Sequence, residues 1–356
     1  MSAYSAPLLR RATKPLREYG ILVALAAMVI VVQSINSSFT NTDNLLNIGA
    51  QWAPTAIMAA GMTFVLIGGG FDLSVGATLA LSATLSARIA EHHAPGLALT
   101  TVLLVGALIG LLNGLLVTKV NVNPFVATLG MAQIVRGAAL IYSDGGSISI
   151  SNGLYDWLGG GEVGTIPVSF LIAIVVMVVF GLILAYSLYG RSLYAIGGNN
   201  EASYVSGIRT DRVRATTYVI CGMCAAAAGA IYAGRIGNGQ GNLATGIELD
   251  VIAAALIGGV SIAGGQGAIW RAAAGIALLA VLQNFFNSQN INEFWQLVFK
   301  GIIIIAAVGL DSFAKHPYRR SVRTFVRDVR HRGWGGARRL PVAVKADQGP
   351  AGADSG

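Results

Sequence analysis

The stretch from Met62 to Gly76 reads MTFVLIGGGFDLSVG and decides the fold class, because it sets a glycine run and an aspartate between two long apolar segments. Residues 49–69 and 73–90 are each long enough to cross, as a helix, a hydrocarbon core about 30 Å thick. Unpaired backbone N–H groups in the glycine run could not face lipid, where each would cost several kcal/mol. The run must therefore contact protein or water, so we expect a broken pair of membrane helices.

The composition of the whole chain also indicates a membrane protein. Of its 356 residues, 54% are hydrophobic and 11% are charged, whereas ordinary soluble domains contain about 25% charged residues. Apolar stretches of spanning length recur about ten times, which predicts an all-α membrane protein. The expected spans are residues 20–36, 49–69, 73–90, 96–118, 124–142, 166–189, 212–235, 250–266, 268–287 and 294–311.

The basic residues predict how these spans are oriented. With the N-terminus in the cytoplasm, 20 of the 24 Lys and Arg residues fall in inside segments, as the positive-inside rule requires. We therefore expect both termini in the cytoplasm. Residues 1–19 would form a basic N-terminus, residues 20–311 the transmembrane domain, and residues 312–356 a basic, largely disordered tail. Attraction to the membrane surface then explains the net charge of +8, and no nucleic-acid partner is expected.

A second glycine-rich break, GGVSIAGGQG, covers residues 258–267. It follows an apolar approach similar to the one before the first break, five spans earlier. An odd offset places the two halves in opposite orientations, and inverted repeats with broken helices are common in transporters. We therefore expect two inverted, glycine-interrupted halves, with chance similarity of two short glycine runs as the alternative.

Glycine also predicts close packing of one particular helix. Within residues 96–118, Gly106, Gly110 and Gly114 recur every four residues along one face. Small residues at this spacing let the backbone of a second helix approach closely, which is how membrane helices gain packing contacts. Residues 96–118 are therefore expected to pack tightly against another span.

The longest inside segment ahead of the tail, residues 190–211, has an unusual composition for a connector. Asn199 or Asn200 can cap a short helix from Glu201 to Ser206, and Gly207 would end that helix. A polar connector is the plain interpretation. The apolar and glycine content instead favours an amphipathic helix that docks in a groove of another protein.

This segment resembles the cytoplasmic coupling segment of the ribose-type monosaccharide permeases of bacterial ABC importers. Residues 62–76, 123–137 and 248–267 resemble further motifs of that family, and the likeness runs from about Phe39 to Asp311. Three departures from the family pattern are Ser203 in place of an alanine, Phe71 in place of an isoleucine, and the pair Trp270-Arg271 in place of small residues. Phe71 and Trp270 indicate either a different substrate or different packing, and different packing is favoured.

The resemblance implies a transporter subunit and not an enzyme. No G-x-x-x-x-G-K-[ST] phosphate loop occurs in the chain, so ATP hydrolysis is expected in a separate cytoplasmic ATPase subunit. The other implied partners are a periplasmic sugar-binding protein, a second permease chain forming a homodimer, and the lipid bilayer of the inner membrane. The implied cargo is a monosaccharide of ribose, xylose or galactose type. We expect no catalytic residue, metal or cofactor.

Two sets of residues are expected to carry this function. Neutral sugars call for polar and aromatic side chains at membrane depth rather than strong charge. Within the coupling segment 190–211, residues 199–207 are expected to sit in a groove of the ATPase. For Asp72 the competing role is the N-cap of the following helix, and for Asn113 and Asn284 it is hydrogen bonding between helices. The pathway set is Phe71, Asp72, Ser74, Asn113, Thr128, Gln283 and Asn284; the coupling set is Gly197, Asn199, Glu201, Ala202, Ser206 and Gly207.

Two other classes of protein compete with this interpretation. An ion-driven secondary carrier shares inverted repeats and broken helices, and Asp72 is its one strong candidate for a coupling carboxylate. A membrane-embedded enzyme needs converging His, Asp or Glu side chains at membrane depth, and the sequence offers almost none. Uptake driven by an ion gradient without ATP would favour the carrier, and activity of the purified chain on a lipid or sugar would favour the enzyme.

Overall fold

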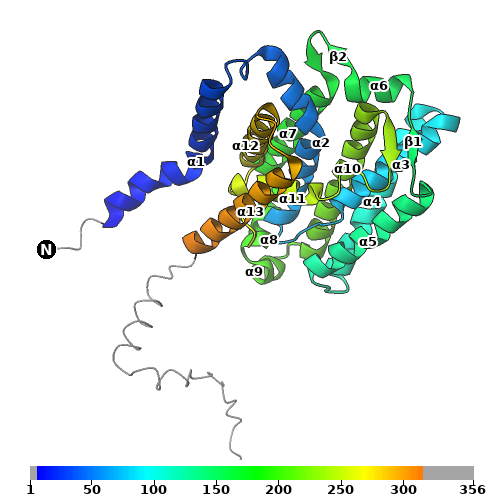
Figure 1. Ribbon diagram of the computed structural model, residues 1–356. Helices are drawn as coiled ribbons and strands as arrows, with labels where there is room; N and C mark the ends of the chain where they lie inside the picture. The colour runs from blue at the N-terminus through cyan, green and yellow to red at the C-terminus, as the bar shows by residue number, and fades with distance from the viewer. Residues whose placement is uncertain (1–5, 316–356) are drawn as a thin grey trace, which may run out of the picture. The chain divides into compact units, whose positions relative to one another are not determined.

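The computed structural model describes residues 6–315, so almost all of the tail predicted for residues 312–356 lies outside the described residues. The chain divides into one unit of residues 1–308 and a second from residue 309 on, and the contacts below lie within the first. The described part is built of thirteen helices and four very short strands (Figure 1). The helices are α1 (Ala6–Ile35), α2 (Thr42–Ile67), α3 (Val75–His92), α4 (Pro95–Thr118), α5 (Pro124–Tyr142), α6 (Gly153–Gly160), α7 (Val168–Tyr186), α8 (Leu188–Gly198), α9 (Asn200–Val205), α10 (Thr210–Ile236), α11 (Ile247–Ile257), α12 (Ile269–Ser288) and α13 (Glu293–Lys315); the strands are β1 (Ser147–Ser149), β2 (Glu162–Val163), β3 (Ile166–Pro167) and β4 (Asn238–Gln240).

Six of the described helices are long and apolar enough to cross a membrane, namely α2, α4, α5, α7, α10 and α12. They coincide with six of the predicted spans, which supports an all-α, multi-pass membrane protein. α1 contains a shorter apolar part, Tyr19–Ile35, and continues unbroken through residue 19, where the sequence had indicated the end of a separate basic segment. The total of about ten spans and the inverted relation of the two halves stay predictions.

Both predicted helix breaks are present. α2 ends at Ile67 and α3 begins at Val75, so residues 68–74 form the first break. The second break runs from Gly258 to Ala268, between α11 and α12. Gly69 and Gly259 occupy corresponding places just after α2 and α11, with φ of +76° and +87°. Glycine takes up this left-handed conformation without steric penalty, which allows each helix to end there.

The span predicted for residues 250–266 is helical only as far as Ile257. α11 has 11 residues, which rise only about 17 Å at 1.5 Å per residue, and the chain beyond Ile257 is not helical until Ile269. Residues 258–266 are nevertheless mostly apolar or small. Hydropathy therefore extends through the break, although the left-handed Gly259 ends the helix.

Residues 190–211, interpreted from the sequence as a connector that contains one short helix, are mostly helical. α8 runs from Leu188 to Gly198, and α9 begins after the single residue Asn199. The short helix expected here is confirmed. The side chain of Asn199 caps it by accepting from the N–H of Ala202 at 3.0 Å, and Gly207 follows with φ of +85°.

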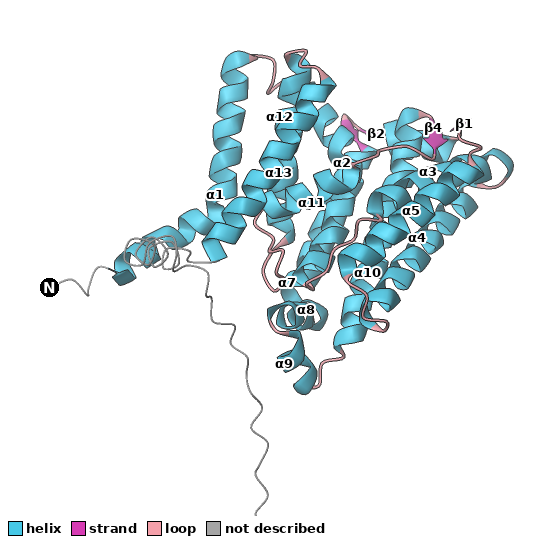
Figure 2. Cartoon of the chain, turned by 60° about the horizontal axis from the view of Figure 1, so that its bottom comes forward, coloured by secondary structure: helices cyan, strands magenta, loops and turns pink. Residues whose placement is uncertain are grey.

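α2 forms the centre of the first unit. Its residues from Ala53 to Ile67 are almost entirely buried, and α7, α10, α11 and α12 pack around it (Figure 2). α4 packs most extensively against α10, along the predicted glycine face. A Cβ atom at Gly106 or Gly110 would collide with the carbonyl oxygen of Gly222 or Tyr218, respectively, so the two backbones touch. The close packing predicted for residues 96–118 is therefore confirmed.

The strands were not predicted and mark one end of this unit. β1 pairs with β4 in antiparallel register, Ser147 opposite Gln240, and β2 pairs with β3 in a hairpin. Figures 1 and 2 both place β2 at the end of the molecule away from α9. The segments that follow α5 and α10 are thereby tied together at that end.

Candidate functional site

Three of the predicted pathway residues form one hydrogen-bonded cluster at the first break. Asp72, Ser74 and Asn113 are at most 1% exposed. Oδ1 of Asp72 accepts from the backbone N–H of Ser74 at 2.9 Å, from its hydroxyl at 2.6 Å and from Nδ2 of Asn113 at 3.4 Å. Nδ2 of Asn113 also donates to the Ser74 hydroxyl at 2.9 Å. The cluster thus joins α4 to the break between α2 and α3.

Asp72 and Asn113 each had a competing structural role, as a helix N-cap and as a hydrogen-bond donor between helices. Ser74, and not Asp72, is the N-cap residue of α3, so the expected cap at Asp72 is displaced by two positions. Asp72 instead accepts from the N–H of the cap residue, in a turn that holds the start of α3. Asn113 makes structural hydrogen bonds, as in the alternative to a pathway role, but they join α4 to the first break and not to another helix.

The other predicted pathway residues lie away from this cluster. Nδ2 of Asn284 in α12 donates to Asn44 at 3.1 Å, in the first turn of α2. α2 has 26 residues, so its two ends lie about 39 Å apart. Asn284 and its neighbour Gln283 are therefore at the far end of α2 from Asp72. Thr128 is buried but donates only within its own helix, to the carbonyl oxygen of Pro124 at 2.8 Å.

Phe71 and two residues outside the predicted pathway set lie around the first break. Phe71 is half-buried against the main core. The hydroxyl of Tyr218 in α10 packs directly on Gly70, and Oε2 of Glu248 in α11 lies against Gly76 in the first turn of α3. A carboxylate is favoured beside the free N–H groups of a helix start. Glu248 could have been proposed as a site residue from the sequence, because an acidic residue in the first turn of an apolar helix indicates a functional position.

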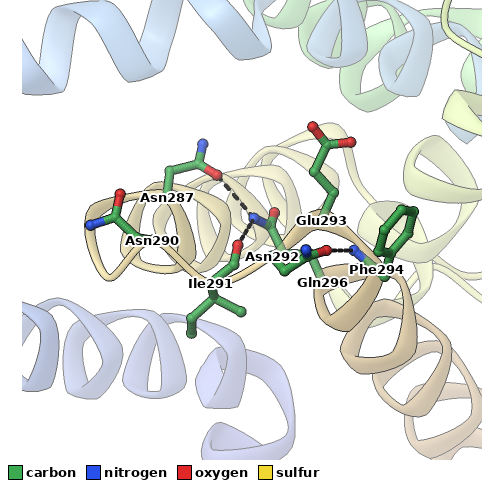
Figure 3. A pocket seen from close by; sticks show the side chains of 7 residues that line it. All are labelled: Asn287, Asn290, Ile291, Asn292, Glu293, Phe294 and Gln296. Carbon is green, nitrogen blue, oxygen red and sulfur yellow. Dashed lines mark hydrogen bonds between the residues drawn. The ribbon is translucent and has the colours of Figure 1, made fainter.

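Polar cavities occur at the end of the molecule away from α9. One, with a volume of about 520 Å³, lies at the turn between α12 and α13 (Figure 3). There the side-chain amide of Gln296 donates to Asn287 at 3.1 Å and to the carbonyl oxygen of Ile291 at 2.9 Å. Another, of about 530 Å³, is bordered by Asp43, Glu162 and Arg235. Amides and a few charges around open space suit ligands rich in hydroxyl groups. Among the described residues, no group of three or more His, Cys, Asp or Glu could hold a metal ion.

The predicted coupling residues divide into two groups. Asn199, Glu201, Ala202, Ser206 and Gly207 are all exposed on or beside α9. Gly197 differs, because it is packed against other backbone segments at the end of α8.

Apolar side chains on α9 are exposed as well. Tyr204 and Val205 are 70% and 82% exposed. α9 thus presents a tyrosine and a valine on the surface next to the polar residues of the coupling set.

A comparison with protein families matches residues 44–308 to the family described as branched-chain amino acid transport system, permease component. The ribose import permease of Bacillus subtilis is 40% identical over 299 residues, which cover 83% of this chain and 93% of that protein. The chain belongs to the ribose-type sugar permeases of ABC importers. The ribose import permease of Escherichia coli is 35% identical over 83% of this chain and 94% of its own length. The L-arabinose transport system permease of Escherichia coli is 35% identical over 86% of this chain and 93% of its own length.

Membership of this permease family decides between the classes weighed from the sequence. The chain is a sugar permease of an ABC importer, a transporter subunit rather than an enzyme, and a multi-pass protein of the inner membrane. Permeases of such importers imply an ATPase and a binding protein as partners. No solved structure matches the chain.

Proposed function

We propose that this permease forms the membrane pathway for a monosaccharide of ribose, xylose or galactose type. A periplasmic binding protein delivers the sugar, a separate ATPase subunit supplies the energy, and a second copy of the chain completes the assembly. Relatives named for ribose and for L-arabinose support a small sugar as the substrate.

The observation that carries this proposal is the surface of α9. Tyr204 and Val205 are exposed next to each other on α9, and grouped apolar side chains on a surface are typical of a site where another protein docks. The Asn199 cap holds these six residues as a helix, so the surface is preformed for a groove in the ATPase subunit. Nucleotide-driven closure of the ATPase subunits would then move α8 and α9 and switch the helices between inward-open and outward-open states.

We infer that the α9 end faces the cytoplasm and that both termini lie on that side. Arg191 and Arg209, which precede and follow α9 in the chain, are exposed. Asp211, two residues after Arg209, forms an ion pair with Lys119 at 2.9 Å. Basic residues favour the cytoplasmic side of spans. The polar cavities at the other end would then face the binding protein.

The test is to place a charge on the α9 surface. Val205→Asp is expected to abolish co-purification of the tagged ATPase subunit and ATP-dependent sugar uptake, because a carboxylate would be buried in an apolar contact without a partner. The matched control is Val163→Asp, since Val163 is 56% exposed in the hairpin at the other end. It should bind the ATPase subunit as the unchanged chain does. If Val205→Asp retains the ATPase subunit and uptake, the assignment of α9 as the docking element is wrong.

A further inference from the structure

Three chain segments meet by direct backbone contact at the end of α8, which together with α9 forms the coupling helices. They are the end of α8 at Gly197 and Gly198, the last residue of α2, Ile67, and the second break at Gly264 and Gly265. The backbone N–H of Gly265 donates to the carbonyl oxygen of Ile67 at 2.9 Å. The last residue of α2 and the second break are therefore hydrogen-bonded to each other at the point where the end of α8 contacts both.

Gly197 is the centre of this junction. A Cβ atom there would collide with the carbonyl oxygen of Ile67 and with the N–H of Gly265, and would lie 2.9 Å from the Cα of Gly265. Both neighbours are backbone atoms, so no side chain can rotate away to make room. Gly197 therefore fits only because it has no side chain.

The second break is shaped to reach this position. Gly264 and Gly265 have φ of +84° and +71°, a conformation that favours glycine. A Cβ at Gly264 would lie 3.0 Å from the carbonyl oxygen of Gly197 and 3.1 Å from the Cα of Gly69 in the first break. The second break thus packs against both the end of α8 and Gly69 of the first break.

One side chain strengthens the same connection. The hydroxyl of Tyr194 in α8 donates to the carbonyl oxygen of Gly267 at 2.7 Å. Burial raises the pKa of Tyr194, so the hydroxyl stays protonated and remains a donor. α8 is thereby held to the second break at two places, Tyr194 and Gly197.

We propose that Gly197 is a positioning residue that transmits movement of the coupling helices to both helix breaks at once. This inference rests on the proposed function, since it assumes that the ATPase subunit moves α8 and α9. Backbones in direct contact transmit displacement because packed interiors have low compressibility. Ile67 is followed five residues later by Asp72, so movement at the junction reaches the buried polar cluster of the first break.

The structure supplies a matched pair of variants to test this. A Cβ at Gly197 has no room, whereas a Cβ at the adjacent Gly198 meets nothing within 4 Å. Gly197→Ala and Gly198→Ala are compared in the complete importer, reconstituted in lipid vesicles with its ATPase subunit and sugar-loaded binding protein. The measurements are subunit assembly, basal ATP hydrolysis, its stimulation by the loaded binding protein, and sugar uptake per ATP hydrolysed.

We expect Gly197→Ala to assemble and to keep basal hydrolysis, and to lose at least about tenfold in uptake per ATP, the size of a typical coupling between sites. Gly198→Ala should match the unchanged chain in all four measurements. Equal uptake per ATP in the two variants overturns the inference. If the unchanged permease neither binds the ATPase subunit nor stimulates it, the proposed function fails instead.

A milder variant covers the case in which Gly197→Ala does not assemble. Tyr194→Phe removes only the hydroxyl that donates to Gly267 and leaves the glycine contacts intact. It should lower uptake per ATP by about fivefold, with assembly and basal hydrolysis unchanged, as expected for one hydrogen bond of about 1 kcal/mol. Unchanged uptake per ATP in an assembled Tyr194→Phe importer, together with loss of assembly in Gly197→Ala, overturns the inference, because the junction is then only structural.

Discussion

At the scale of single residues, Asp72 shows how a carboxylate is accommodated inside a membrane protein. It is 1% exposed, and three donors from Ser74 and Asn113 surround one of its oxygens. These bonds replace part of the hydration that the group loses on burial. Its position in the break was predicted from the sequence, but its partner Asn113, 41 residues further along the chain, was not.

Removing this acceptor should cost stability. Asp72→Ala leaves the hydroxyl of Ser74 and the amide of Asn113 without their shared partner, so we expect the free energy of unfolding to fall by about 1–3 kcal/mol. Asp72→Asn retains an acceptor oxygen and should lose less. Unfolding in mixed detergent micelles gives the measurement, with Asp156→Ala, at an exposed position in α6, as the control. An Asp72→Ala variant as stable as this control would contradict the role of the cluster.

At the scale of elements, glycines along one helix face have different functions from glycines elsewhere. In α4, Gly106 and Gly110 let the backbone of α10 touch the helix, whereas at Gly130 and Gly137 of α5 a Cβ atom would meet nothing within 4 Å. The four-residue spacing in α4 predicted this contact, but only the structure identifies α10 as the partner helix.

The two helices provide paired substitutions. Gly110→Ala should lower the free energy of unfolding by about 1–3 kcal/mol, because the added methyl group meets the backbone of Tyr218 and Val219. Gly137→Ala should leave it unchanged or raise it by up to about 1 kcal/mol, since alanine is the better helix former. Both values come from unfolding in mixed micelles. Equal effects of the two substitutions would show that α4 and α10 are not in backbone contact in the membrane.

At the scale of the whole molecule, the described part has two unlike ends. α9 presents exposed apolar side chains at one end, and the β2–β3 hairpin lies at the other, as Figures 1 and 2 agree. This polarity matches what an importer needs, with an ATPase on one side of the membrane and a binding protein on the other. The orientation itself was predicted from the distribution of Lys and Arg.

Thiol labelling in intact cells tests the orientation directly. The chain has two cysteines, Cys221 and Cys224, and both are buried, so the background should be low. A membrane-impermeant maleimide is expected to label Val163→Cys in intact cells, and to label Val205→Cys only after the cells are opened. Labelling of Val205→Cys from outside would place α9 in the periplasm and contradict the proposed docking of the ATPase subunit.

The family and most helices could be predicted from the sequence, because the signals concerned are local. A run of apolar residues is long enough for a span whatever surrounds it, and six predicted spans correspond to membrane helices of the structure. Asn199 and Gly207 delimit α9 through their own hydrogen bonding and backbone freedom. The helix over residues 250–266 was overestimated for the same reason, since hydropathy does not register a left-handed glycine.

Only the tertiary structure decided which distant segments meet. Asp72 and Asn113, or Gly197, Ile67 and Gly265, are far apart in the chain, and nothing in the spacing around any of them indicates its partners. Such contacts depend on how whole helices pack, which is set by the sum of many side-chain and backbone contacts along each helix. The sequence by itself therefore indicated six of the apolar helices, both breaks and the kind of transporter, and packing determined how α8 and α9 reach the breaks.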